Sequence, residues 1–124
     1  MSDLEKEPSA KVELIENIEP SANIGFLANV GSSADKRLRV SGELSFKSVP
    51  ELVANSRNFF KGSNSFDVDL VDVKRADSAG VALLIEWQRQ TKQQNKSIDF
   101  YNIPSQMLAI ARLSGVDELL SLKN

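Results

Sequence analysis

The chain has 124 residues, of which 41% are hydrophobic, and a formal net charge of −2, which suits one globular domain with a real core. It contains neither cysteine nor histidine, so disulfides, thiol chemistry, imidazole metal ligands and histidine-based catalytic triads are excluded. It has no clustered Lys and Arg, no apolar run of the roughly 20 residues that span a bilayer and no secretory signal, so we expect a cytoplasmic protein whose main ligand is not nucleic acid.

Residues 1–23 form a polar segment that is broken by Pro8 and Pro20. A weak apolar stripe on a possible short helix is made by Val12, Leu14, Ile15 and Ile18. We expect a flexible N-terminal segment, with docking on a partner as the alternative. The domain itself is expected to cover residues 24–124.

Two strands are expected at the start of that domain. Residues 24–30 read IGFLANV, and residues 37–41 (RLRVS) alternate polar and apolar side chains with a period of two. A loop of small residues separates them. This order of strand, loop and strand suggests an antiparallel hairpin.

A capping box at residues 48–51 predicts the start of the first helix. Ser48 can accept a hydrogen bond from an early backbone N–H while Glu51 reaches back, and Pro50 is tolerated in a first turn. The apolar residues that follow have helical spacing, with Ser56 as the small member of the stripe, and Gly62 ends the helix.

Residues 66–73, in which apolar residues alternate with aspartates before two valines, predict the central strand. It should be parallel to the preceding strand, because a whole helix separates the two. A helix follows Ser78, and a last strand is expected at residues 97–102. Pro104 opens a further helix that ends at Gly115 with Val116 folded back, and a short helix is expected over residues 117–122.

The resulting order β-β-α-β-α-β-α predicts an α/β sandwich. We expect a mixed sheet of about four strands with helices mainly on one face.

The segment Asp77-Ser78-Ala79-Gly80 stands where the central strand passes into a helix. Ser78 is well placed to be the N-cap of a helix over residues 79–95, and capping alone would account for it. A hydroxyl at this edge of an α/β sheet also suits a binding site, and a phosphate there would repel a partner fitted to neutral serine. Catalysis is not expected, because Ser78 has no histidine to activate it.

Several neighbouring residues are weaker candidates. Lys74 and Arg75 form a basic turn that is either plain solvated charge or a contact for an acidic partner. Leu83 and Trp87 could be an exposed anchor for a partner, but core packing explains them equally well.

Three aspartates of the central strand, Asp67, Asp69 and Asp72, could suggest Mg²⁺. Alternation would place Asp72 on the other face, so no metal site is expected.

Residues 69–84, DLVDVKRADSAGVALL, together with VSGEL at 40–44 and the helices expected over 104–120, resemble a STAS domain. This is the domain shared by anti-sigma-factor antagonists and the tails of sulfate transporters. The resemblance covers residues 24–122, most of the chain. Within the family, DSAG followed by VALL is more similar to the MlaB type.

That resemblance implies a protein that is not an enzyme and needs no cofactor. It would bind and stabilise or regulate the ATPase subunit of an Mla-type ABC transporter that moves phospholipid and maintains outer-membrane lipid asymmetry. The contact would be the surface around Ser78, where the family carries serine or threonine, with Asp69 and Asp77 matching acidic positions that flank the motif. The protein would reach the inner face of the inner membrane only through the transporter complex.

The resemblance also implies an alternative role, because the position of Ser78 is phosphorylated in the sigma-factor branch. The partners would then be an anti-sigma factor and a serine kinase. Ser45 stands where the family usually has aspartate close to the acceptor site. This departure favours constitutive binding over the phosphorylation switch.

Overall fold

The fold is built on one five-stranded sheet in a computed structural model that describes residues 10–17 and 36–123. The strands lie in the order β1-β2-β3-β4-β5, with β1 antiparallel to β2 and all other neighbours parallel. Their bounds are β1 Ala10–Asn17, β2 Lys36–Leu44, β3 Ser65–Ala76, β4 Ser97–Tyr101 and β5 Leu122–Lys123.

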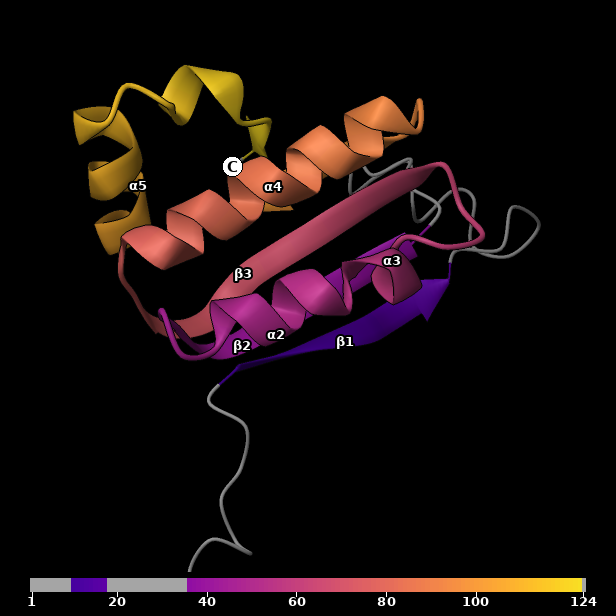
Figure 1. The fold of residues 1–124 in the computed structure, drawn as a ribbon, viewed down its shortest axis with the longest axis horizontal. Helices are drawn as coiled ribbons and strands as arrows, with labels where there is room; N and C mark the ends of the chain where they lie inside the picture. The colour runs from indigo at the N-terminus through magenta and orange to yellow at the C-terminus, as the bar shows by residue number, and fades with distance from the viewer. Residues whose placement is uncertain (1–9, 18–35, 124) are drawn as a thin grey trace, which may run out of the picture.

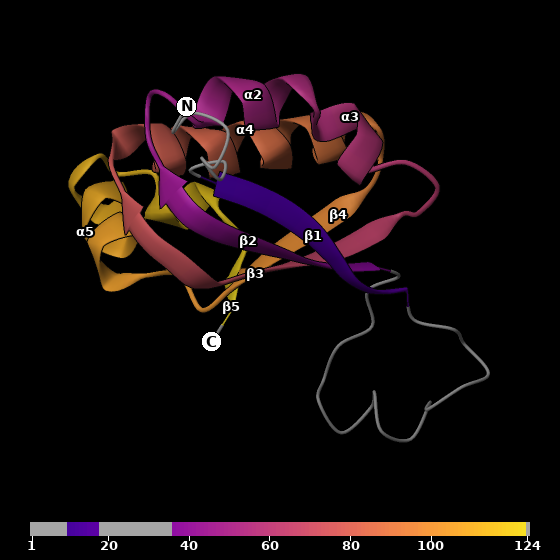
Figure 2. The ribbon, with the colours of Figure 1, turned by 90° about the horizontal axis from the view of Figure 1, so that it is seen from below.

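The helices pack on one face of this sheet, with α5 at one end of the molecule (Figures 1 and 2). Their bounds are α2 Val49–Ala54, α3 Ser56–Phe59, α4 Ser78–Gln93, α5 Ser105–Leu113 and the 3₁₀ turn η2 Asp117–Leu119. The predicted α/β sandwich with a mixed sheet is therefore confirmed. The prediction of about four strands is roughly right for a sheet of five, in which β1 and β5 were not expected as strands.

The core lies between the sheet and the helices. Its largest fully buried side chains come from β2, β3, β4, α4 and α5: Val40, Leu44, Phe66, Val68, Leu70, Leu83, Leu84, Trp87, Phe100 and Met107. Leu83 and Trp87 have no exposed surface, so the reading of this pair as a partner anchor is wrong and the core reading is right.

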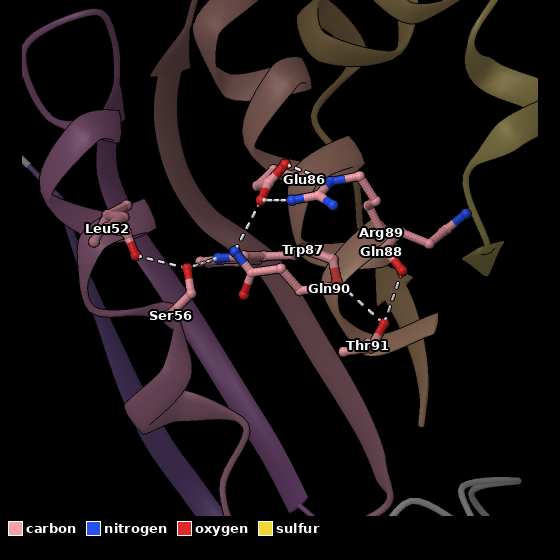
Figure 3. A network of polar contacts seen from close by, with 8 residues as sticks. All are labelled: Leu52, Ser56, Glu86, Trp87, Gln88, Arg89, Gln90 and Thr91. Atoms are coloured by element: carbon pink, nitrogen blue, oxygen red, sulfur yellow. Dashed lines mark hydrogen bonds and ion pairs between the residues drawn. The ribbon is translucent and has the colours of Figure 1, made fainter. Parts of the chain in front are cut away.

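One hydrogen-bond network fixes α3 against α4 inside the core. The Trp87 indole donates to Ser56 Oγ at 2.7 Å, and that hydroxyl donates to the Leu52 carbonyl at 3.0 Å (Figure 3). Ser56 is fully buried, so its small side chain supplies the partner that a buried indole N–H requires.

The segment predicted to be a flexible tail or a short helix is in part a strand. Residues 10–17 form β1, which pairs with β2 in a register that places Val12 opposite Val40 and Leu14 opposite Leu38. The K-V-E-L alternation matches this pairing, but the stabilising partner lies more than 20 residues away and local sequence does not reveal it. The strand predicted at residues 24–30 lies outside the described residues.

The prediction of a capping box at residues 48–51 is also wrong. Ser48 precedes α2, but its hydroxyl accepts from the Ser45 N–H at 3.0 Å and donates to the Glu43 carbonyl at 2.7 Å instead of capping the helix. The helix predicted as one piece breaks at Asn55 into α2 and α3. The serine therefore stabilises the turn that connects β2 to α2.

The C-terminal half follows the sequence more closely. Val116 N–H donates to the Ala111 carbonyl at 2.9 Å and Gly115 N–H to the Arg112 carbonyl at 3.1 Å, with Gly115 at φ +73°. This is the predicted Schellman ending. The helix predicted over 117–122 is only the turn η2. It cannot continue, because the Phe100 N–H donates to the Ser121 carbonyl at 2.8 Å and residues 122–123 pair with β4.

Irregularities in β3 correct one further expectation. The register against β2 shifts between Asp69 and Asp72, so Asp72 lies opposite Ser41 and pairs with Arg39 at 3.6 Å. Asp72 therefore shares the face of Asp69 instead of lying on the other one. No cluster of metal-ligating residues is found in the described part of the chain, where no helix is long and apolar enough to cross a membrane either.

We expect Ser56→Ala to lower the free energy of unfolding by about 1–3 kcal/mol, because it leaves the buried Trp87 N–H without an acceptor. Urea denaturation followed by circular dichroism measures this loss. In a Trp87→Phe background, where the donor is already gone, the same substitution should cost clearly less. Equal costs in the two backgrounds would show that the hydrogen bond contributes nothing.

Candidate functional site

The carboxyl ends of β2 and β3 lie side by side and bring two connections to one edge of the sheet. Leu44 lies opposite Ala76, and the Asp77 N–H donates to the Leu44 carbonyl at 3.0 Å. The β2–α2 and β3–α4 connections consequently meet at the same end of the molecule (Figure 1). Residues 45–48 and 77–78 thus form one surface, which we call the β2–β3 edge surface.

The first connection, Ser45 to Ser48, is a tight turn held by its own serines. Ser48 N–H and Val49 N–H both donate to the Ser45 carbonyl, at 3.1 and 2.9 Å, and Lys47 N–H donates to Ser45 Oγ at 3.2 Å. These bonds hold the backbone on either side of Phe46, a residue that is 73% exposed.

The second connection leads into α4, whose N-cap is Asp77 and not Ser78 as the sequence suggested. Asp77 has extended backbone angles and its Oδ1 accepts from the Ala79 N–H at 2.8 Å. Ser78 is the first helical residue and is exposed. An aspartate has the same capping geometry as serine and adds a charge that the helix dipole favours, so the residue one earlier takes the cap. The Ser78 hydroxyl is left facing outward without a capping role.

Gly80 lets α4 approach the strand ends closely. A Cβ on Gly80 would lie 3.0 Å from the Leu44 Cβ, 3.1 Å from the Ala76 Cβ and 3.4 Å from the Met107 Cε. Two of these atoms are fixed to the backbone of neighbouring strands and cannot move aside. Gly80 is therefore a packing residue that positions Asp77 and Ser78, and it is itself buried.

Beside Ser78 the surface is hollowed. A depression of about 200 Å³ is lined by Glu43, Ser45, Arg75, Asp77 and Gln106, with the walls from β2, β3 and α5. Ser45, the departure from the family pattern, and Asp77 both line it. Arg75, one of the predicted supporting residues, is part of the wall of this depression.

The sequence reasoning missed Phe46. It is a single aromatic residue in the turn SFKS, between the strand that ends at Leu44 and the helix that begins at Val49. A large apolar residue placed in a turn is the signal that could have identified it, because a turn lies at the surface and leaves such a side chain exposed.

Asp69 does not join the site. It lies on the helix-free face of the sheet, where its Oδ1 accepts from the Val71 N–H at 3.0 Å and from the Asn102 amide at 2.9 Å. Six strand residues lie between Asp69 and Ala76, a span of roughly 20 Å. Lys74 is exposed near the end of β3 and is closer to the site than Asp69.

A second depression surrounds Asp69 on that face, about 200 Å³ in volume and lined by Arg37, Asp67, Tyr101 and Asn102 as well. Arg37 and Asp67 lie 3.5 Å apart in an ion pair. Burial raises the pKa of Tyr101, as do the charges of Asp67 and Asp99, while Arg37 acts in the opposite direction. The tyrosine thus stays neutral, and the face is polar and largely paired.

We expect Asp77→Ala to lower the free energy of unfolding by about 1 kcal/mol, because the Ala79 N–H loses its acceptor. Ser78→Ala should change it by less than about 0.5 kcal/mol, as for an exposed residue. Urea denaturation of both variants distinguishes the two positions. If Ser78→Ala were as costly as Asp77→Ala, the serine would share the capping role.

Gly80→Val should lower the free energy of unfolding by about 2–3 kcal/mol, because its side chain overlaps Leu44 and Ala76. Gly80→Ala should lose less, since a gain in helix propensity of about 1 kcal/mol offsets part of the overlap. Ala82→Val, at an exposed position of the same helix, is the control. A Gly80→Val protein as stable as this control would contradict the close packing.

Comparison with solved structures gives the same architecture. The anti-sigma factor antagonist SpoIIAA in its unphosphorylated form is 16% identical, with a TM-score of 0.61 over 93% of this chain and 88% of that one. An anti-sigma factor antagonist from Mycobacterium paratuberculosis is 15% identical, with a TM-score of 0.64 over 94% and 87%. The Bacillus cell fate determinant SpoIIAA in the phosphorylated form is 19% identical, with a TM-score of 0.54 over 72% and 82%. At these identities the likeness concerns the fold.

Comparison with curated proteins finds no match. A family model described as "Mlab, STAS domain" matches residues 28–121, which is most of the chain. The match includes the turn at Ser45, the Asp77–Gly80 connection and the helices that follow. The chain therefore belongs to the STAS domain family, in its MlaB type.

Proposed function

We propose that this chain is a non-enzymatic accessory subunit that binds the ATPase subunit of an Mla-type ABC transporter for phospholipid. Binding stabilises or regulates that ATPase, in the cytoplasm at the inner face of the inner membrane, and so serves outer-membrane lipid asymmetry. The proposal rests on the MlaB-type family match together with the β2–β3 edge surface.

The observation that carries the proposal is that Phe46 is exposed on the same edge as Ser78, which is also exposed and does not cap α4. The turn that carries Phe46 is already hydrogen-bonded, so its backbone loses little entropy on binding, and burial of the ring in a partner is worth about 1.5–3 kcal/mol. The same edge of the sheet offers the Ser78 hydroxyl, Arg75 and Asp77 as polar contacts. An apolar centre with a polar rim is the usual anatomy of a protein interface.

A role in binding rather than catalysis also agrees with the chemistry of the edge. The chain has no histidine or cysteine that could activate or replace the Ser78 hydroxyl as a nucleophile. Any nucleotide hydrolysis would then be performed by the partner ATPase.

A second candidate function is a phosphorylatable anti-sigma-factor antagonist. Two observations favour it: the fold resembles SpoIIAA in both its unphosphorylated and phosphorylated forms, and Ser78 is exposed at the first position of α4. A phosphate there would be accepted by the helix N-terminus and would add charge beside Asp77. Ser45 in place of the family aspartate remains the argument against this alternative.

We expect Phe46→Ala to weaken binding of the transporter ATPase subunit at least tenfold, the equivalent of about 1.4 kcal/mol, without lowering the thermal stability of the chain. Isothermal titration calorimetry with the ATPase subunit encoded beside this chain measures the change. Leu119→Ala removes another exposed apolar side chain, 60% exposed on η2, and should leave affinity unchanged. Equal effects of both substitutions, or no complex with the unaltered chain, would refute the proposal.

Ser78→Glu separates binding from folding. A carboxylate in the first turn of α4 is favoured by the helix dipole, so stability should be kept or slightly raised, whereas affinity for the ATPase subunit should fall. Ser78→Ala should retain affinity. Incubation with the serine kinases of the host followed by intact mass spectrometry tests the alternative: a phosphopeptide that covers Ser78 would support it, and its absence would favour the transporter role.

A further inference from the structure

Strand β1 presents a long open edge. It has eight residues and ends the strand order, whereas the opposite edge strand, β5, has only two. Within residues 10–17 and 36–123, no strand pairs with the outer side of β1. The unpaired N–H and C=O groups of such an edge are a template for another strand.

The sequence of β1 is complementary to itself in one antiparallel register. If Val12 lies opposite Val12 of a second copy, Lys11 lies opposite Glu13 of that copy and Glu13 opposite its Lys11. Lys11 and Glu13 already share a face of the strand, and their side chains form an ion pair of 3.5 Å. The Lys11 side chain is 56% exposed and the Glu13 side chain is 50% exposed. Two copies would thus form a cluster of four alternating charges, and opposite charges directly across a strand pair stabilise it.

The other face of β1 matches in the same register. Ala10 would lie opposite Leu14 of the second copy, on the side that carries the helices, next to the Val12 pair. Leu14 is 51% exposed in one copy, which leaves apolar surface at the edge. Pairing would cover part of it while satisfying the backbone groups of the edge.

From this edge, its charges and its exposed leucine, we propose that two copies of this chain associate through antiparallel pairing of their β1 strands, centred on Val12. The two sheets then join into one, related by a twofold axis through the Val12 pair. The inference does not rest on the proposed function, because β1 contributes no residue to the β2–β3 edge surface.

Charge exchange tests the pairing in the full-length chain by sedimentation velocity over a wide range of protein concentration. Glu13→Lys places lysines opposite lysines and Lys11→Glu places glutamates opposite glutamates, so each should raise the dimer dissociation constant about tenfold. The double exchange Lys11→Glu with Glu13→Lys restores opposite charges and should restore the dimer. An equimolar mixture of the two single variants should form a heterodimer.

Cysteine cross-linking tests the register, since the chain has no cysteine of its own. Opposite residues of antiparallel strands have Cα atoms about 4.5–5.5 Å apart, within reach of a disulfide. Val12→Cys should therefore form a dimer linked through the twofold axis on oxidation. Leu14→Cys is the control, because its two copies would be about 14 Å apart and should not cross-link.

A monomer at every concentration would overturn the proposal, as would a dimer that none of the charge variants changes. Cross-linking of Leu14→Cys as fast as that of Val12→Cys would overturn the register. Circular dichroism of each variant shows whether it is folded. If a single variant is unfolded, the double variant Lys11→Glu with Glu13→Lys takes its place, because it keeps the composition of β1.

Discussion

The structure depends on the close approach of α4 to the carboxyl ends of β2 and β3. Gly80 makes this approach possible, because the Cβ of any other residue would press against Leu44 and Ala76 at 3.0 and 3.1 Å. The same contact brings Asp77 to the end of β2, where its N–H bonds to the Leu44 carbonyl and its carboxylate caps the helix. One glycine and one aspartate therefore set the start of α4, and with it the direction of the longest helix of the fold.

The candidate site follows from that arrangement. Because Asp77 carries the cap, the Ser78 hydroxyl is free for an external contact, and because β2 and β3 are parallel neighbours, Phe46 is carried to the same edge. Phe46 and Ser78 are exposed, whereas Leu44, Ala76 and Gly80 are buried. For the proposed partner, the hydrogen-bonded turn and the capped helix are already formed, so little backbone ordering would oppose binding. One charge added at Ser78 would be felt by such a partner more than by the fold.

How far the site could be predicted differs from residue to residue. Asp77, Ser78 and Gly80 were identified from the strand-turn-helix pattern, and the structure places Arg75 beside them. Asp69 was grouped with them from its nearness in sequence, but the structure places it at the second depression, because nearness in sequence along an extended strand means a large separation in space. Phe46 was missed because it comes to the edge that carries Ser78 only through the parallel pairing of β2 with β3, which joins residues about 30 positions apart.

The sequence by itself determined the α/β class, the central parallel strand, the position of α4 and the Schellman ending of α5, because these depend on local periodicity and on glycine at a left-handed position. Tertiary structure alone decided which residue caps α4, that residues 10–17 form an edge strand, and that residues 122–123 join the sheet. The two strands depend on hydrogen-bond partners far along the chain, and Asp77, whose carboxylate makes a local cap, is held at the strand ends by the bond from its N–H to the Leu44 carbonyl. Local patterns state what a segment can form, and only the distant partner selects which of those forms is stable.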